Sequence, residues 1–175
     1  MKTINKIIRE EISLNDLINK TTDLIAEGLN NPIPVNLNKV GSNYEGEFNI
    51  DSNSYKIIIE ETSPNCYIFK FTKDDSYELV DDVKKAFQVI PTIRKVAENF
   101  TMENKPNMFS FFITDGSRGR DKIYSSFTND ISKKYNYEKN IKKYDDKIKS
   151  YILFNNKTTD EDFSSLIRNI DRYRN

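Results

Sequence analysis

Residues 44–72, YEGEFNIDSNSYKIIIEETSPNCYIFKFT, decide the fold class of this chain. In the first part, Tyr44, Gly46, Phe48 and Ile50 alternate with other residues, which is the period of a strand with one buried face. Two further apolar runs, SYKIIIEE and CYIFKFT, follow after the short polar turns DSN and TSPN. Three strands joined by tight turns predict an antiparallel meander.

After the meander, helical and strand patterns alternate. Apolar residues at helical spacing predict a helix over 88–103, which we start near Gln88 because proline is tolerated in the first turn and Pro91 follows closely. The preceding residues 73–86 are expected to form a loop. The nearly all-apolar run 108-MFSFFIT-114 predicts a central strand. The other expected elements are a helix over 119–135, strands over about 140–144 and 148–154, and a closing helix from Asp160.

This order of elements predicts one α+β domain over 1–175, with a mostly antiparallel sheet flanked by helices. Its N-terminal part is expected to be helical, because Ser13 is a good N-cap, apolar residues recur at helical spacing over 14–27, and Gly28 stops the pattern. We expect both terminal helices to pack on the sheet, and the last is the better candidate for binding a partner. The segments are an N-terminal helical part, a core and a C-terminal helix, over 1–35, 36–154 and 155–175.

Histidine is absent, and its absence excludes several classes of catalytic site. Histidine is the usual general base near neutral pH and the commonest zinc ligand, so the chain lacks both. A Ser-His-Asp or Cys-His site is also excluded. The one cysteine, Cys66, excludes an internal disulfide and a Cys-rich metal site. Because Cys66 lies in the apolar run CYIFKF, we expect it to pack in the core. We expect neither a metal nor a cofactor.

The formal charge of the chain is zero but unevenly distributed. Residues 118–150 hold ten Lys and Arg residues against five Asp and Glu, a net charge of +5, and residues 1–117 carry −5. No apolar run approaches the ~20 residues of a membrane span, and charges interrupt the N-terminus too often for a signal peptide. The heavy use of Lys, Asn, Ile and Tyr is typical of AT-rich genomes, including those of phages. We expect a soluble protein of the cytoplasm, or of the virion if a phage encodes it.

Over 44–154 the order of elements resembles the second part of the GNAT acetyltransferase fold, in which a meander leads to a helix, a central strand, a second helix and a final hairpin. The second helix of that family often has Asn, then Ala three residues later, then Leu-Tyr. Here Ser117, Arg120 and Tyr124 occupy the Asn, Ala and Tyr positions, and of these only Tyr124 matches. The resemblance implies that Tyr124 would be the general acid if this chain were an acyltransferase.

The part of the acetyltransferase family that binds coenzyme A has no counterpart in this sequence. In that family a Gln/Arg-x-x-Gly-x-Gly/Ala turn opens the helix after the meander, and its backbone N–H groups hold the pyrophosphate. Here the corresponding helix opens AFQVIPTIRK, which contains no glycine and in which Pro91 removes a donor. We therefore expect that coenzyme A does not bind.

The stretches AFQVIPTIRKVAENF and FFITDGSRGRDKIYSSF are also similar to small uncharacterised phage proteins, which carry a Phe-x-Val-x-x-Thr helix followed by a strand and an Arg-x-x-x-Tyr helix. This resemblance covers a minor part of the chain and contains no chemical motif. It implies a phage-associated protein of GNAT-like topology. Our first hypothesis is a non-enzymatic protein that binds another protein, in a virion or as an accessory or host-takeover factor. A coenzyme A-dependent N-acyltransferase is the second.

The loop 115-DGSRGR-120 is the candidate site of the sequence. It lies after a predicted strand and before a predicted helix, so backbone N–H groups at the helix start, with Arg118 and Arg120, would favour an anion or an acidic partner. The loop lacks the Gly-Lys-Ser/Thr of a phosphate loop and the spacing of a dinucleotide fingerprint. The alternative, which we favour, is a simple turn in which Asp115 or Ser117 caps the helix.

Lysines and tyrosines are interleaved in 133-KKYNYEKNIKKYDDKIK-149, and this pattern gives the third hypothesis, a nucleic-acid-binding module over 118–150. Basic residues beside Tyr135, Tyr137 and Tyr144 would stack bases of single-stranded nucleic acid. We favour instead a solvated face around two edge strands. A cluster of carboxylates over 74–82 could hold a divalent cation, but it has no calcium-loop glycine, so a metal is not expected there. Its members are Asp74, Asp75, Glu78, Asp81 and Asp82.

Overall fold

The computed structural model describes residues 31–73, 83–113, 118–144 and 148–172, and within these it describes 83–87, 113 and 118–123 by their backbone alone. The helix expected over 14–27 lies outside the described residues. The described strands are β1 (Asn38–Val40), β2 (Asn43–Ile50), β3 (Asn53–Ser63), β4 (Cys66–Lys73), β5 (Met108–Ile113), β6 (Glu138–Lys143) and β7 (Lys149–Phe154), and the helices are α2 (Val83–Asn104), α3 (Arg118–Tyr135) and α4 (Asp160–Asp171).

The seven described strands form one sheet in the order β1-β2-β3-β4-β5-β7-β6. Every neighbouring pair is antiparallel except β4 and β5, which are parallel because α2 connects them. The α+β class and the mostly antiparallel sheet flanked by helices are therefore confirmed. The nearly all-apolar strand β5 lies between β4 and β7, which confirms its predicted central position.

The predicted meander is formed by β2, β3 and β4, and its turns follow from local chemistry. Ile50 pairs with Asn53 and Ser63 with Cys66, so two residues make each turn. Asp51 and Asn65 have φ values of 53° and 61°, in the left-handed region that short Asp and Asn side chains tolerate. The register places the alternating apolar residues of all three strands on the same face.

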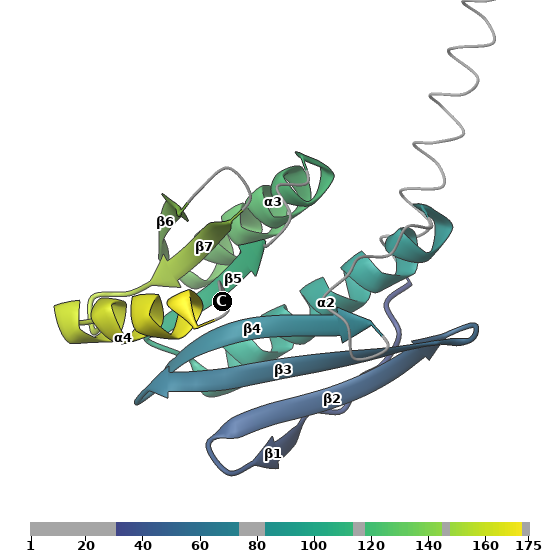
Figure 1. Ribbon diagram of the computed structural model, residues 1–175, viewed down its shortest axis with the longest axis horizontal. Helices are drawn as coiled ribbons and strands as arrows, with labels where there is room; N and C mark the ends of the chain where they lie inside the picture. Colours follow the sequence, from purple (N-terminus) through teal and green to yellow (C-terminus); the bar gives the residue numbers. More distant parts are fainter. Residues whose placement is uncertain (1–30, 74–82, 114–117, 145–147, 173–175) are drawn as a thin grey trace, which may run out of the picture.

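Two hydrophobic clusters cover the two faces of the sheet. The larger lies between the sheet and the helices α2 and α3, and the smaller lies under α4, which crosses the opposite face (Figure 1). Core residues of the larger cluster include Tyr55, Ile57, Ile59, Phe69, Phe109, Phe111 and Leu153 from strands, with Ile93, Ala97, Phe100, Phe127 and Ile131 from helices. The smaller cluster comprises Cys66, Ile68, Met108, Ile152, Leu166 and Ile170.

The segment before β1 adds to the larger cluster, although it has no regular secondary structure. Val35 and Leu37 pack against the core, and the backbone N–H of Ile33 donates to Oγ1 of Thr92 in α2 over 2.9 Å. The segment passes so close to β2 that a Cβ atom on Gly46 would lie 2.7 Å from Cγ1 of Val35. Glycine is therefore required at this strand position for close approach and not for a turn.

The start of α2 corrects the sequence prediction. The helix begins at Val83, before the predicted start at Gln88, so the end of the expected loop 73–86 is helical and Pro91 lies inside the helix. A proline there removes one intrahelical hydrogen bond. The helix continues because packing outweighs that loss: Pro91, Thr92 and Ile93 are all buried, and Oγ1 of Thr92 donates to the carbonyl of Gln88 over 2.7 Å.

At the two edges the structure also differs from the prediction. β1 was not predicted, and it is a three-residue strand whose side chains are all exposed. The final hairpin is confirmed, with β6 starting at Glu138 and β7 at Lys149. The closing helix from Asp160 is confirmed as α4, which begins with Thr159 as its N-cap and Asp162 completing a capping box.

Candidate functional site

The residues of the candidate loop 115-DGSRGR-120 fall at the start of α3. Asp115 and Ser117 lie outside the described residues. Arg118 and Arg120 belong to the first turn of α3, which begins at Arg118, and their side chains are not among those described. The helix therefore starts within the loop sequence. A capping turn and an anion site both require this start, so it does not distinguish them. The described residues test neither the simple turn, which we favour, nor anion binding at this loop.

Tyr124, the residue that the acetyltransferase resemblance singles out, is part of the core. The residue is 8% exposed, and its ring stacks against Phe111 of β5, with the ring centroids 6.2 Å apart. Phe127 and Tyr151 are also within aromatic contact, at centroid distances of 5.1 and 6.3 Å. Aromatic pairs at these distances stabilise the packing of a helix on a sheet. The ring of Tyr124 thus holds α3 against β5 and β7.

β4 and β5 pair over a short length only. The register runs from Cys66 and Met108 to Phe69 and Phe111, after which β4 continues to Lys73 and β5 to Ile113 without further pairing. Figure 1 shows the two strands diverging beyond this point. At the last pair, the rings of Phe69 and Phe111 lie 5.2 Å apart on the face that α2 and α3 cover.

On the opposite face, β4 carries a buried lysine. Lys70 is 6% exposed and forms an ion pair with Glu60 of β3. Burial lowers the pKa of Lys70 from its usual value, and the hydrogen bond to Glu60 acts in the other direction. Nearby, Ser110 of β5 and Ser150 of β7 share a hydrogen bond of 2.6 Å. Lys70 pairs with Glu60 and Ser110 pairs with Ser150, and we assign both pairs a structural role.

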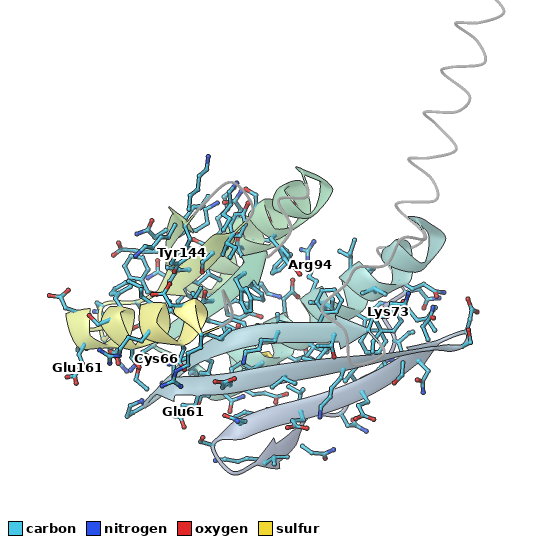
Figure 2. The ribbon with its side chains drawn as sticks, in the orientation of Figure 1. Glu61, Cys66, Lys73, Arg94, Tyr144 and Glu161 are labelled. Atoms are coloured by element: carbon cyan, nitrogen blue, oxygen red, sulfur yellow. The ribbon has the colours of Figure 1, made fainter. Side chains whose placement is uncertain are left out.

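Cys66 is buried beside α4, as Figure 2 shows, and its predicted core position is confirmed. Burial raises the pKa of its thiol to about 11, with the nearby carboxylate of Asp162 acting in the same direction. A thiol with this pKa remains protonated near neutral pH. Cys66 is therefore not an activated nucleophile.

The tyrosines of the lysine-rich segment do not form an open stacking platform. Tyr137 is buried, and its hydroxyl group donates to the backbone carbonyl of Pro106 over 2.6 Å, while burial raises its pKa to about 12. Lysine ammonium groups lie 5.2 Å from the ring centroids of Tyr135 and Tyr144. The arrangement thus buries one of the three rings and places cations over the other two.

Charges between α2 and α3 are paired. Arg94 of α2 lies between the two helices (Figure 2), with Nε 3.0 Å from Oε1 of Glu98 and Nη2 3.0 Å from Oδ2 of Asp130. Lys134 of α3 approaches Glu98 as well, at 3.7 Å. The basic residues of α3 near this contact therefore serve helix packing.

Two of the three lysines of β6, Lys139 and Lys143, have a different environment. β6 is the last strand of the sheet order, and no described residue pairs with its outer edge. Lys139 and Lys143 form no ion pair with a described carboxylate, and Ile141 between them is 41% exposed. The sequence indicated the lysine excess of this region, but it did not indicate which backbone groups would face outward.

Within the described parts of the chain, no group of three or more His, Cys, Asp or Glu side chains is placed to hold a metal ion. The acidic cluster over 74–82 lies outside the described residues. None of the helices among the described residues has the length and apolar character needed to cross a membrane.

The chain was compared with known protein families, with curated proteins and with solved structures, and none of them matches it. Among the described residues, β6 combines features that could serve binding: an outer backbone edge, the lysines Lys139 and Lys143, and the exposed Ile141 between them. The one thiol of the chain has a raised pKa, so it does not add a nucleophile to these features.

Proposed function

We propose that this chain is a non-enzymatic protein that acts by binding another protein. The observation that carries the proposal is the packing of Tyr124, whose ring is enclosed by Phe111, Phe127 and Tyr151. Its position corresponds to the general acid of the acetyltransferases that the sequence resembles. A ring packed in the core accounts for an aromatic residue at this position without catalysis.

The scaffold supports the same proposal. A meander, a helix, a parallel partner strand, a second helix and a hairpin follow one another as in the GNAT fold, and we propose that this chain has a GNAT-like topology. Residues 74–82, which precede α2 in the sequence, contain five carboxylates and no glycine. Carboxylates would repel a pyrophosphate at the start of α2, and without glycine its close approach to the backbone is hindered.

The resemblance to phage proteins supports the setting that we propose, which is a virion or the cytoplasm of an infected cell. A partner there would be a virion protein or a host factor. Nucleic acid is less favoured as a partner, because Tyr137 is buried and bonded to Pro106 instead of being available for stacking.

The second candidate is a coenzyme A-dependent N-acyltransferase. It is favoured by one observation, the divergence of β4 and β5 after the pair Phe69 and Phe111. Calorimetry with acetyl-coenzyme A separates the candidates. We expect no saturable heat. Binding of acetyl-coenzyme A with a dissociation constant of roughly 1 μM, which is a binding free energy of about −8 kcal/mol, would overturn the proposal.

A conservative variant adds a second test. Tyr124→Phe keeps the buried ring and removes the hydroxyl group. Wild type and variant are each expressed as tagged baits in infected cells, and the captured proteins are identified by mass spectrometry. We expect both baits to capture the same proteins. Acyl transfer to an amine that is present in the wild type and abolished by Tyr124→Phe would instead establish the acyltransferase.

Salt dependence tests the third hypothesis. If the 118–150 surface bound single-stranded DNA or RNA, affinity would fall steeply with salt as phosphate contacts release counterions. We expect no salt-sensitive binding of either nucleic acid in a filter-retention assay, and a steep dependence would favour the nucleic-acid-binding module.

A further inference from the structure

The outer edge of β6 presents backbone groups in a defined pattern. The N–H of Tyr144 donates to the carbonyl of Ile148 over 3.0 Å, one position beyond the last register pair, Lys143 with Lys149. In an antiparallel ladder, hydrogen-bonded pairs alternate with non-hydrogen-bonded pairs. The even-numbered residues of β6 therefore bond to β7. The odd-numbered residues, Lys139, Ile141 and Lys143, direct their N–H and C=O groups to the outer edge.

The side chains of the same three residues share one face of the sheet. Lys139 is opposite Leu153 and Ile141 is opposite Tyr151, and both partners belong to the core beneath α3. Consistently, Nζ of Lys139 donates to Oδ1 of Asn129 in α3 over 2.5 Å. We call Lys139, Ile141 and Lys143 the edge row.

The electrostatics of the edge row favour a negatively charged neighbour. Lys143 is directly opposite another lysine, Lys149, in the register, so this strand pair supplies no carboxylate to Lys143. The described partner of Lys139 is an uncharged amide. Carboxylates placed beside Lys139 and Lys143 would pair charges that have no ion pair among the described residues.

Edge lysines also serve as a barrier against pairing with other chains. The edge row differs from a simple barrier because a 41% exposed isoleucine lies between its two lysines. Such a row repels basic strands and a second copy of itself, and it accepts an acidic strand with an apolar residue at its centre. The opposite sheet edge, β1, has only three residues, and Lys39 there lies 5.8 Å from the ring of Tyr44.

We propose that the edge row binds an extended acidic segment of a partner protein by antiparallel strand addition. The segment carries carboxylate, apolar and carboxylate side chains at alternate positions, facing Lys143, Ile141 and Lys139. Main-chain hydrogen bonds supply affinity, and the alternate side chains supply specificity. This inference rests on the proposed function and names the chemistry of its partner.

The test uses the full chain and a capped synthetic peptide, acetyl-Thr-Glu-Thr-Val-Thr-Glu-Thr-amide. We expect saturable binding by calorimetry, with amide NMR shifts at Lys139, Ile141 and Lys143 and with affinity that falls as salt is added. A peptide with Lys in place of both Glu should not bind. No shift at these three amides at millimolar peptide would overturn the inference.

Backbone pairing is tested on the peptide, so that the fold of the protein is unchanged. N-methylation of the central Val removes the N–H that faces Ile141, and we expect affinity to fall roughly tenfold or more. N-methylation of an adjacent Thr, whose N–H faces away from β6, is the matched control and should have a smaller effect. Equal affinities of the two methylated peptides would overturn strand addition.

Charge selectivity is tested with two variants of the protein. Lys143→Glu changes the edge row, and we expect it to weaken peptide binding roughly tenfold. Lys142→Glu makes the same charge change on the opposite face of β6 and should have a smaller effect. Equal losses would mean that general charge attracts the peptide, and would overturn the edge row as the site.

Ile141→Pro removes one outward N–H and retains the ladder with β7, since proline is tolerated on an edge strand in that orientation. We expect it to abolish peptide binding, with an unchanged thermal melt.

If the peptide does not bind while a captured protein partner is retained equally by wild type and Ile141→Pro, this inference fails and the proposed function stands. Binding of acetyl-coenzyme A would overturn the proposed function. Concentration-dependent dimers that Ile141→Pro abolishes would show a second copy as occupant and overturn the acidic partner.

Discussion

Ser63 donates a hydrogen bond from its hydroxyl group to Oδ1 of Asp162 over 2.6 Å, and so joins the end of β3 to the first turn of α4. Oδ2 of Asp162 accepts from the backbone N–H of Thr159 over 2.9 Å, and Oγ1 of Thr159 accepts from the N–H of Asp162 over 3.2 Å. The bond from Ser63 is the main cause that lowers the pKa of Asp162. One carboxylate therefore both starts α4 and attaches it to the sheet.

We predict that Asp162→Ala lowers the free energy of unfolding by roughly 1–2 kcal/mol at pH 7. Because the pKa of Asp162 is lowered in the folded state, its contribution is fully present above the ordinary carboxyl pKa of about 4 and is lost as pH falls through the folded value. Urea unfolding of both proteins at pH 7 and pH 3 should show a smaller difference at pH 3. The control Glu161→Ala, in the same helical turn, should cost less, and an equal difference at both pH values would contradict the prediction.

Gly46 gives a second prediction. A Cβ atom there would lie 2.7 Å from Cγ1 of Val35, 3.0 Å from the carbonyl oxygen of Asn36 and 3.1 Å from Cδ2 of Leu37. We expect Gly46→Ala to lower the free energy of unfolding by roughly 1–3 kcal/mol, the usual cost of overpacking. Thermal or urea unfolding measures it.

A double-mutant cycle identifies the cause of the loss at Gly46. Val35→Ala removes the nearest methyl group, so the double variant should be less destabilised than the sum of the two single variants. Strict additivity would show that the clash with Val35 is not what makes Gly46→Ala unfavourable.

The sequence predicted the meander because its alternation coincides with burial. Phe48, Ile50, Tyr55, Ile57 and Ile59 all occupy the face that α2 and α3 cover. It missed β1, since three exposed residues have no hydrophobic period to detect. It placed the start of α2 too late because proline disfavours a helix interior locally, whereas the burial of Pro91 in the folded chain depends on residues distant in sequence.

The candidate site was less predictable than the fold. Lysines beside tyrosines indicate a nucleic-acid surface equally well whether the rings are exposed or buried, and only the fold shows that Tyr137 bonds to Pro106, 31 residues away. The edge row could not be foreseen either. Its backbone direction depends on the register of β6 with β7, and a shift of one residue would turn the outward groups of Ile141 inward.

Cys66 provides a third prediction. Burial raises its pKa to about 11, so the reactive thiolate is scarce until pH approaches that value. Alkylation by iodoacetamide at pH 8, followed by mass spectrometry, should be at least roughly a hundredfold slower in the native protein than in urea, where the thiol has its ordinary pKa of about 8.5. Rapid modification of the native chain at pH 8 would contradict the burial of this thiol beneath α4.

The last prediction concerns Lys70 and Glu60, whose side chains are 4% and 25% exposed. Removing one member of a buried ion pair leaves the other charge desolvated, while removing the more buried charge also removes its desolvation cost. We expect Glu60→Gln to lower the free energy of unfolding by roughly 2 kcal/mol, below the value for a fully buried pair because Glu60 contacts solvent. Lys70→Met should change it by less than about 1 kcal/mol.

The matched control is Glu45→Gln, which breaks the 2.6 Å ion pair with Lys56, where both side chains are about a third exposed, at 31% and 33%. It should cost less than about 1 kcal/mol. A pH series adds a signature that packing alone would not give. Burial lowers the pKa of Lys70 in the folded state, and Glu60 counteracts this, so Glu60→Gln should lower the pKa of Lys70 further. A lowered folded-state pKa makes folding more favourable as pH rises toward the ordinary lysine value. The stability deficit of Glu60→Gln should therefore shrink between pH 8 and pH 10. A deficit that is constant over this range, or a larger loss for Lys70→Met than for Glu60→Gln, would show that the lysine is not held there as a buried charge.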